Sequence, residues 1–119
     1  MPHFLLRHVA SPAASAIFYA ELLERQPVEA SPGFVMFALS PELKLGLWAR
    51  EGVVPAPSGA SGGSELAFPV GDPAAVDATC AAWSGRGVTI LQPPIDLDFG
   101  RSFVAVDPDG HWLRVFAPG

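Results

Sequence analysis

Apolar and polar positions alternate along the chain in short blocks, which predicts several short strands and two helices. Apolar segments at residues 4–9 and 66–70 have the composition of strands. A helix-forming run follows each segment and begins with a capping residue and a proline, Ser11-Pro12 and Asp72-Pro73. Residues at helical spacing predict that each helix buries one face, with Ser15, Phe18, Tyr19 and Leu22 in the first helix and Val76, Cys80 and Trp83 in the second.

The second half of the chain repeats the first. Three more strand segments follow each predicted helix, at residues 28–30, 34–39 and 43–49 in the first half and at 88–91, 102–106 and 111–117 in the second. Each half therefore has the order strand, helix, strand, strand, strand. The sequence predicts a single domain over residues 1–119, in which a first βαβββ module at 1–50 and a second at 64–119 are joined by a linker at 51–63.

Residues 92–100 have no counterpart in the first half. The matching segments lie 61 residues apart at Val9 and Val70, but 67 apart at Pro41 and Pro108. The second half therefore contains extra residues, and the segment 92–100 is the obvious insertion. The sequence predicts a loop there, and such loops frequently carry function.

Charge and composition exclude several classes of partner. The chain has 7 basic and 12 acidic residues, a net charge of −5, and no basic block that would bind nucleic acid or an anionic membrane. Charged residues and prolines interrupt every apolar stretch before the roughly 18 residues that a membrane span needs. We therefore expect a cytoplasmic protein, and the single cysteine, Cys80, fits a reducing compartment.

Two features of the pattern together resemble a known superfamily. They are the tandem βαβββ order and the turn Val106-Asp107-Pro108-Asp109-Gly110-His111. Both resemble the vicinal oxygen chelate superfamily, which includes glyoxalase I, bleomycin resistance proteins, fosfomycin resistance enzymes and extradiol dioxygenases. The resemblance implies an α+β fold in which tandem βαβββ modules form a curved mixed sheet, the glyoxalase/bleomycin resistance fold, and it implies a homodimer.

The same resemblance locates the place where catalytic members hold a divalent metal ion. It assigns the four ligand positions to Phe4, Gly46, Glu65 and Arg114. Only Glu65 can ligate, because Phe has no lone pair, Gly has no side chain and a guanidinium stays protonated. The sequence therefore predicts no metal or other cofactor. Since an unpaired charge in a cavity is costly, we expect a bidentate salt bridge between Glu65 and Arg114 where a metal would sit.

Strand alternation extends the wall of this expected pocket, because residues two apart share a face of the sheet. The missing side chain at Gly46 leaves room beside Trp48, which suits a flat aromatic ligand. Trp48 and Trp112 can equally be core or dimer-interface residues, and Gly46 can mark a close approach of strands. The further candidates for the wall are Leu6, His8, Trp112 and Phe116, with Phe99 and Phe103 at the rim or in the core.

Three functions remain open on this basis. The first is metal-independent binding and sequestration of a planar aromatic small molecule, because Gly46-Leu47-Trp48 and the segment 99–103 look most like phenazine-antibiotic resistance proteins. The alternative is a metal-dependent lyase or dioxygenase resembling glyoxalase I, with the metal on Glu65 and on His3 or His8. The third is a dimer without a ligand. No catalytic residue is assigned, and Cys80 is expected to be a buried, inert thiol.

Overall fold

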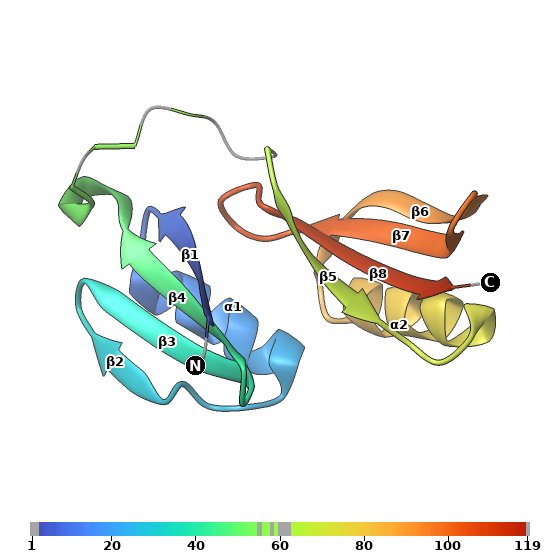
Figure 1. Cartoon of the computed structure of the whole chain (residues 1–119), viewed down its shortest axis with the longest axis horizontal. Helices are drawn as coiled ribbons and strands as arrows, with labels where there is room; N and C mark the ends of the chain where they lie inside the picture. Colours follow the sequence, from blue (N-terminus) through green and yellow to red (C-terminus); the bar gives the residue numbers. More distant parts are fainter. Residues whose placement is uncertain (1–2, 55, 58, 60–62, 119) are drawn as a thin grey trace. The chain divides into compact units, whose positions relative to one another are not determined.

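The computed structural model describes residues 3–54, 56–57, 59 and 63–118, and it divides into two compact units at residues 1–59 and 60–119. Both units have the order strand, helix, strand, strand, strand, so the predicted α+β repeat is confirmed (Figure 1). The first unit contains β1 (His3–Val9), α1 (Pro12–Leu23), β2 (Glu29–Ser31), β3 (Phe34–Ser40) and β4 (Leu43–Ala49). The second contains β5 (Glu65–Pro69), α2 (Pro73–Gly85), β6 (Thr89–Leu97), β7 (Gly100–Val106) and β8 (Trp112–Pro118).

Each unit has its own mixed four-stranded sheet. The strand order is β1-β4-β3-β2 in the first unit and β5-β8-β7-β6 in the second, so the first and last strands of each repeat lie side by side. These two pairs are parallel, and the other neighbours are antiparallel. In the second unit Glu65 is opposite Trp112 and Ala67 is opposite Arg114. The register therefore brings Glu65 to the strand that carries Arg114.

One face of each sheet packs against the helix of the same unit and forms the core. Along β4 from Leu45 onward and along β8 the odd-numbered residues are buried, and the even-numbered residues point to the opposite face. The predicted buried faces are confirmed for Ser15, Tyr19 and Leu22 of α1 and for Val76 and Trp83 of α2. Phe18 and Cys80, which were predicted on the same faces, are only half-buried. Trp83 contacts Phe68 and Phe103 edge to face, so this tryptophan packs against the sheet as expected.

Both helices begin at the predicted capping residue. The Ser11 hydroxyl accepts the Ala14 N–H at 3.1 Å, and the Asp72 carboxylate accepts the Ala75 N–H at 2.8 Å. A proline follows each cap, where its missing N–H has no helical partner to lose. Within the described residues, no helix is long and apolar enough to cross a membrane.

The predicted loop at residues 92–100 is wrong. Strand β6 continues to Leu97, and β7 begins at Gly100, so only a short turn separates the strands. The segment contains Pro93 and Pro94, which a central strand would not accept because proline lacks an N–H. β6 is an edge strand, however, and its pairing with β7 shifts register on both sides of Gln92, which accommodates the prolines.

The predicted linker at 51–63 coincides with the boundary between the two units. Residues Arg50–Gly52 form a short 3-10 helix at its start. Residues 55, 58 and 60–62 of the linker lie outside the described residues.

Candidate functional site

The predicted salt bridge between Glu65 and Arg114 is present in the second unit. Nε of Arg114 donates to Oε1 of Glu65 at 2.6 Å, and Nη2 donates to Oε2 at 3.2 Å. The contact is bidentate, the geometry in which a guanidinium and a carboxylate satisfy each other best. The side chain of Arg114 is 18% exposed and that of Glu65 is 32% exposed, so the pair is partly shielded from solvent.

Ser102 binds the remaining nitrogen of the Arg114 guanidinium, Nη1, and sequence reasoning missed this residue. Nη1 of Arg114 donates to Oγ of Ser102 at 2.9 Å, and Ser102 is fully buried. Ser102 lies on β7 opposite Phe116 of β8, so it faces the same side of the sheet as Arg114. The register between β7 and β8 would have identified it, but strand alternation within one segment does not give that register.

A groove of about 480 Å³ lies beside the ion pair in the second unit. Its walls are mostly apolar, and Glu65 and Arg114 provide the charged groups. Phe99 and Phe116 meet edge to face with their ring centroids 6.1 Å apart. The remaining wall residue, Leu97, was not predicted, because it belongs to the part of β6 that the sequence pattern did not identify.

The structure corrects the assignment of Phe103. Phe103 was a candidate for the pocket rim, but it is fully buried and packs against Trp83 of α2. It therefore lies on the helix-facing side of the sheet, opposite to Arg114. Trp112 is half-buried two residues before Arg114 on the same face, although it does not line the groove.

The first unit contains the other five predicted pocket residues on one face of its own sheet. Leu6 is opposite Gly46, and His8 is opposite Trp48. The rings of His8 and Trp48 meet edge to face with centroids 6.3 Å apart. Phe4 precedes Leu6 on the same side of β1, and both residues are exposed. These residues share a face of the sheet as predicted.

The expected vacancy at Gly46 is wrong. A Cβ at this position would lie 2.7 Å from Cδ2 of Leu6 and 2.8 Å from Cζ of Phe34. The two side chains fill the space beside the glycine, so no flat ligand can enter there. The alternative explanation, a close approach that only glycine permits, is the one that the structure supports.

The comparisons with known proteins agree with this architecture. Residues 1–115 match the family model of the Glyoxalase/Bleomycin resistance protein/Dioxygenase superfamily. The chain belongs to this superfamily. It is 29% identical to the phenazine antibiotic resistance protein EhpR of Enterobacter agglomerans, over 96% of this chain and 89% of that protein.

Solved structures of the superfamily share the fold. A protein of Agrobacterium tumefaciens solved by solution NMR is 48% identical, with a TM-score of 0.90 over 100% of this chain and 98% of that one. A glyoxalase-related enzyme from Fulvimarina pelagi is 21% identical, with a TM-score of 0.85 over 98% of this chain and 87% of that one. The glyoxalase/bleomycin resistance fold predicted from the sequence is therefore confirmed.

The residues at the expected metal positions do not fit the divalent metal of the superfamily's enzymes. Phe4 and Gly46 supply no donor atom, and both carboxylate oxygens of Glu65 accept hydrogen bonds from Arg114. A guanidinium next to that carboxylate repels a cation. Among the described residues, no three His, Cys, Asp or Glu side chains come close enough together to hold a metal ion.

Two other candidate groups have structural roles. Oδ1 of Asp107 accepts the N–H groups of Asp109 and His111 at 2.9 and 2.8 Å, so this carboxylate holds the turn before β8. Cys80 is half-buried and not buried as expected, and this partial burial, together with the nearby charge of Asp77, raises the pKa of its thiol. A raised pKa keeps the thiol protonated at neutral pH, which is unfavourable for a nucleophile.

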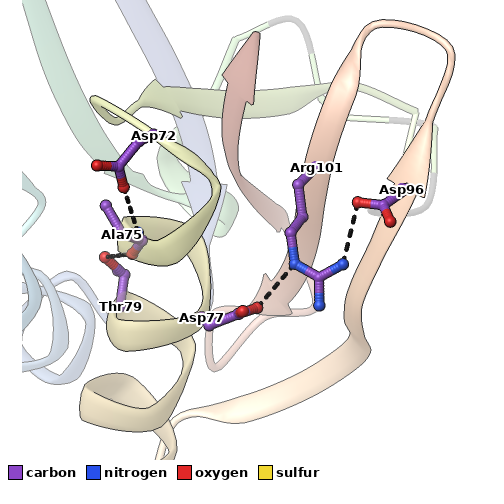
Figure 2. A network of polar contacts seen from close by, with 6 residues as sticks. All are labelled: Asp72, Ala75, Asp77, Thr79, Asp96 and Arg101. Atoms are coloured by element: carbon purple, nitrogen blue, oxygen red, sulfur yellow. Dashed lines mark hydrogen bonds and ion pairs between the residues drawn. The ribbon is translucent and has the colours of Figure 1, made fainter. Parts of the chain in front are cut away.

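Arg101 connects three elements on the helix side of the second unit (Figure 2). Its Nε donates to Asp77 of α2 at 2.9 Å, and its Nη1 donates to Asp96 of β6 at 3.0 Å. The hydrogen bond to Asp77, and to a smaller extent the one to Asp96, raises the pKa of Arg101. The contacts therefore link α2 to the β6–β7 hairpin, whose turn carries Phe99.

Proposed function

We propose that this chain binds and sequesters a planar aromatic small molecule without a metal ion. The supporting observation is the groove of the second unit, where two phenylalanine rings and Leu97 stand beside a fixed ion pair. Aromatic walls with a few oriented polar groups are typical of pockets for small aromatic ligands. The ion pair occupies a position where the superfamily's enzymes have a metal ligand, which supports binding rather than metal-dependent catalysis.

The orientation of the rings supports a flat ligand. Phe99 and Phe116 meet edge to face, so one ring presents its face while the other presents its edge. A planar ligand can stack on one ring and meet the edge of the other, and both arrangements are favourable. Each contact of this kind contributes about 0.5–1.5 kcal/mol beyond the area that it buries.

The relative EhpR supports an antibiotic as the class of ligand. That protein is described as a phenazine antibiotic resistance protein. Phenazines are planar, tricyclic and heteroaromatic, and they have the shape that the groove favours. We therefore propose a role in resistance, in which the protein lowers the concentration of free antibiotic. We place this role in the cytoplasm and in a homodimer, as the sequence predicts.

Calorimetric titration with phenazine tests the proposal. We expect wild-type protein to bind phenazine, and we expect Phe99→Ala to weaken binding about tenfold, because it removes one aromatic contact. Leu91→Ala is the matched control, since Leu91 is 51% exposed and Phe99 is 49% exposed, but only Phe99 lines the groove. The control should bind phenazine as tightly as wild type does.

Two results would contradict the proposal. If phenazine gives no binding up to its solubility limit, the groove does not accept planar aromatic ligands. If elemental analysis finds stoichiometric nickel, zinc, iron or manganese in protein purified without chelator, the metal-free part is wrong, and a lyase or dioxygenase becomes the better explanation.

A further inference from the structure

The two charged side chains of the groove neutralise each other. Arg114 is the only cationic residue among the described groove residues, and two of its N–H groups already bind the carboxylate of Glu65. A ligand carboxylate would have to compete with Glu65 for the guanidinium. It would also lie near a negative charge at short range, which costs binding free energy.

The arginine still offers hydrogen bonds to a neutral ligand. A guanidinium has five N–H groups, and three of them make the contacts to Glu65 and Ser102. One N–H on each Nη atom is left over from these contacts. A ring nitrogen or a ketone oxygen can accept such an N–H without bringing a charge into the groove.

The surroundings of the groove are acidic. Asp98 is exposed and lies between the groove residues Leu97 and Phe99. Arg101, the other arginine near the hairpin, already contacts two carboxylates. Residues 60–119 contain seven acidic and three basic residues, so this unit has a net charge of −4 out of −5 for the chain. These charges disfavour an anion and attract a cation.

We propose that the groove selects neutral or singly cationic planar heteroaromatic compounds and rejects aromatic carboxylates. This inference rests on the proposed function and narrows its ligand class. A ring nitrogen of the ligand accepts from Arg114, while its aromatic plane packs against Phe99 and Phe116. A cationic ring gains further from the face of a phenylalanine ring. Glu65 acts as the residue that determines specificity, because it cancels the charge of Arg114.

Three probes with one ring system test the selection in wild-type protein. They are acridine, which is neutral at neutral pH, 9-aminoacridine, which is a cation, and acridine-9-carboxylate, which is an anion. We expect calorimetric titration to give an affinity for acridine-9-carboxylate at least about tenfold weaker than for acridine. 9-Aminoacridine should bind at least as tightly as acridine.

The variant Glu65→Gln tests the cause of the selection. It leaves the charge of Arg114 uncompensated in the groove, so the affinity for acridine-9-carboxylate should rise about tenfold and that for 9-aminoacridine should fall. Asp72→Asn is the matched control, because it changes the net charge by the same amount at the start of α2 and an asparagine keeps the helix cap. The control should keep the wild-type order of the three probes.

The outcomes separate this inference from the proposed function. If acridine and 9-aminoacridine bind and acridine-9-carboxylate binds equally well or better, the charge selection is wrong, but the sequestration of planar aromatics stands. If none of the three probes binds, both proposals are wrong. If Glu65→Gln and Asp72→Asn change the order of the probes equally, the net charge of the chain, and not Glu65, sets the selection, and the inference is overturned.

Discussion

Gly46 determines how one face of the first sheet packs, because it has a hydrogen atom where other residues have a side chain. Leu6 and Phe34 approach its Cα so closely that a Cβ would lie within 3.0 Å of both side chains. The residue at the centre of this face is therefore buried although it has no side chain of its own. The glycine allows two larger side chains to meet over β4.

Gly46→Ala should destabilise the protein by about 1–2 kcal/mol, because Phe34 must move to make room for the methyl group. Urea denaturation measures this as a lower midpoint at an unchanged slope. Gly33→Ala is the matched control, since a Cβ there meets nothing within 4 Å. If the Gly46→Ala protein is as stable as the Gly33→Ala protein, Leu6 and Phe34 can move to accommodate the methyl group without loss of stability, and the prediction is wrong.

Single residues of the site differ in how far the sequence could predict them. The pairing of Glu65 with Arg114 was predictable, because a lone charge at either position would be costly and the superfamily's pattern brings their strands together. The positions of Ser102 and Phe103 were not predictable. They lie one residue apart on β7 and face opposite sides of the sheet, so a shift of one residue in register would exchange their roles.

At the scale of the elements, the repeat is clearest at the two helix starts. Ser11 and Asp72 hold equivalent positions, have extended backbones and accept an N–H three residues later. Both caps satisfy a backbone donor that has no partner within the helix. These short signals are local, which is why the sequence alone predicted where α1 and α2 begin.

Asp72→Ala should lower the free energy of unfolding by about 1 kcal/mol, because the N–H of Ala75 loses the carboxylate acceptor at 2.8 Å (Figure 2) and keeps only the backbone carbonyl of residue 72 at 3.1 Å. Asp72→Asn serves as the control, since an asparagine caps a helix about as well as an aspartate does. Thermal or urea denaturation of the three proteins measures the difference. Equal losses in both variants would assign the effect to the charge of Asp72 and not to the cap.

Strand β6 was the element that sequence reasoning identified least well. Its first residues form an apolar segment, but Pro93 and Pro94 interrupt the pattern and suggest a loop. A proline signals the end of a strand only where the N–H is needed by a neighbour on that side. Whether a strand lies at an edge depends on the strand order of the whole sheet, which no local pattern contains.

At the scale of the whole molecule, the two units differ in charge and in the kind of surface that they expose. The second unit carries most of the negative charge and contains the groove. The first unit exposes large apolar side chains on the sheet face opposite its helix, with Phe4 55% and Leu6 44% exposed. Exposed apolar side chains that share one face are typical of surfaces that another protein covers.

We expect this face to form part of the interface of the proposed homodimer. Sedimentation equilibrium should give twice the 12.5 kDa of the chain, and Phe4→Ser should weaken the dimer about tenfold, because it removes apolar area from the interface. Ile17→Ser is the control, since Ile17 is 66% exposed on α1. A wild-type protein that is monomeric at micromolar concentrations would contradict the expectation.

The two prolines of β6 have a further consequence for the behaviour of the chain in a crowded solution. Along the outer side of an edge strand, free backbone N–H groups can recruit a strand of another molecule and start fibril growth. Pro93 and Pro94 remove backbone donors from the middle of this strand, and the pairing around Gln92 is irregular. The same residues that obscured the strand in the sequence thus make this edge a poor template for a strand of another molecule.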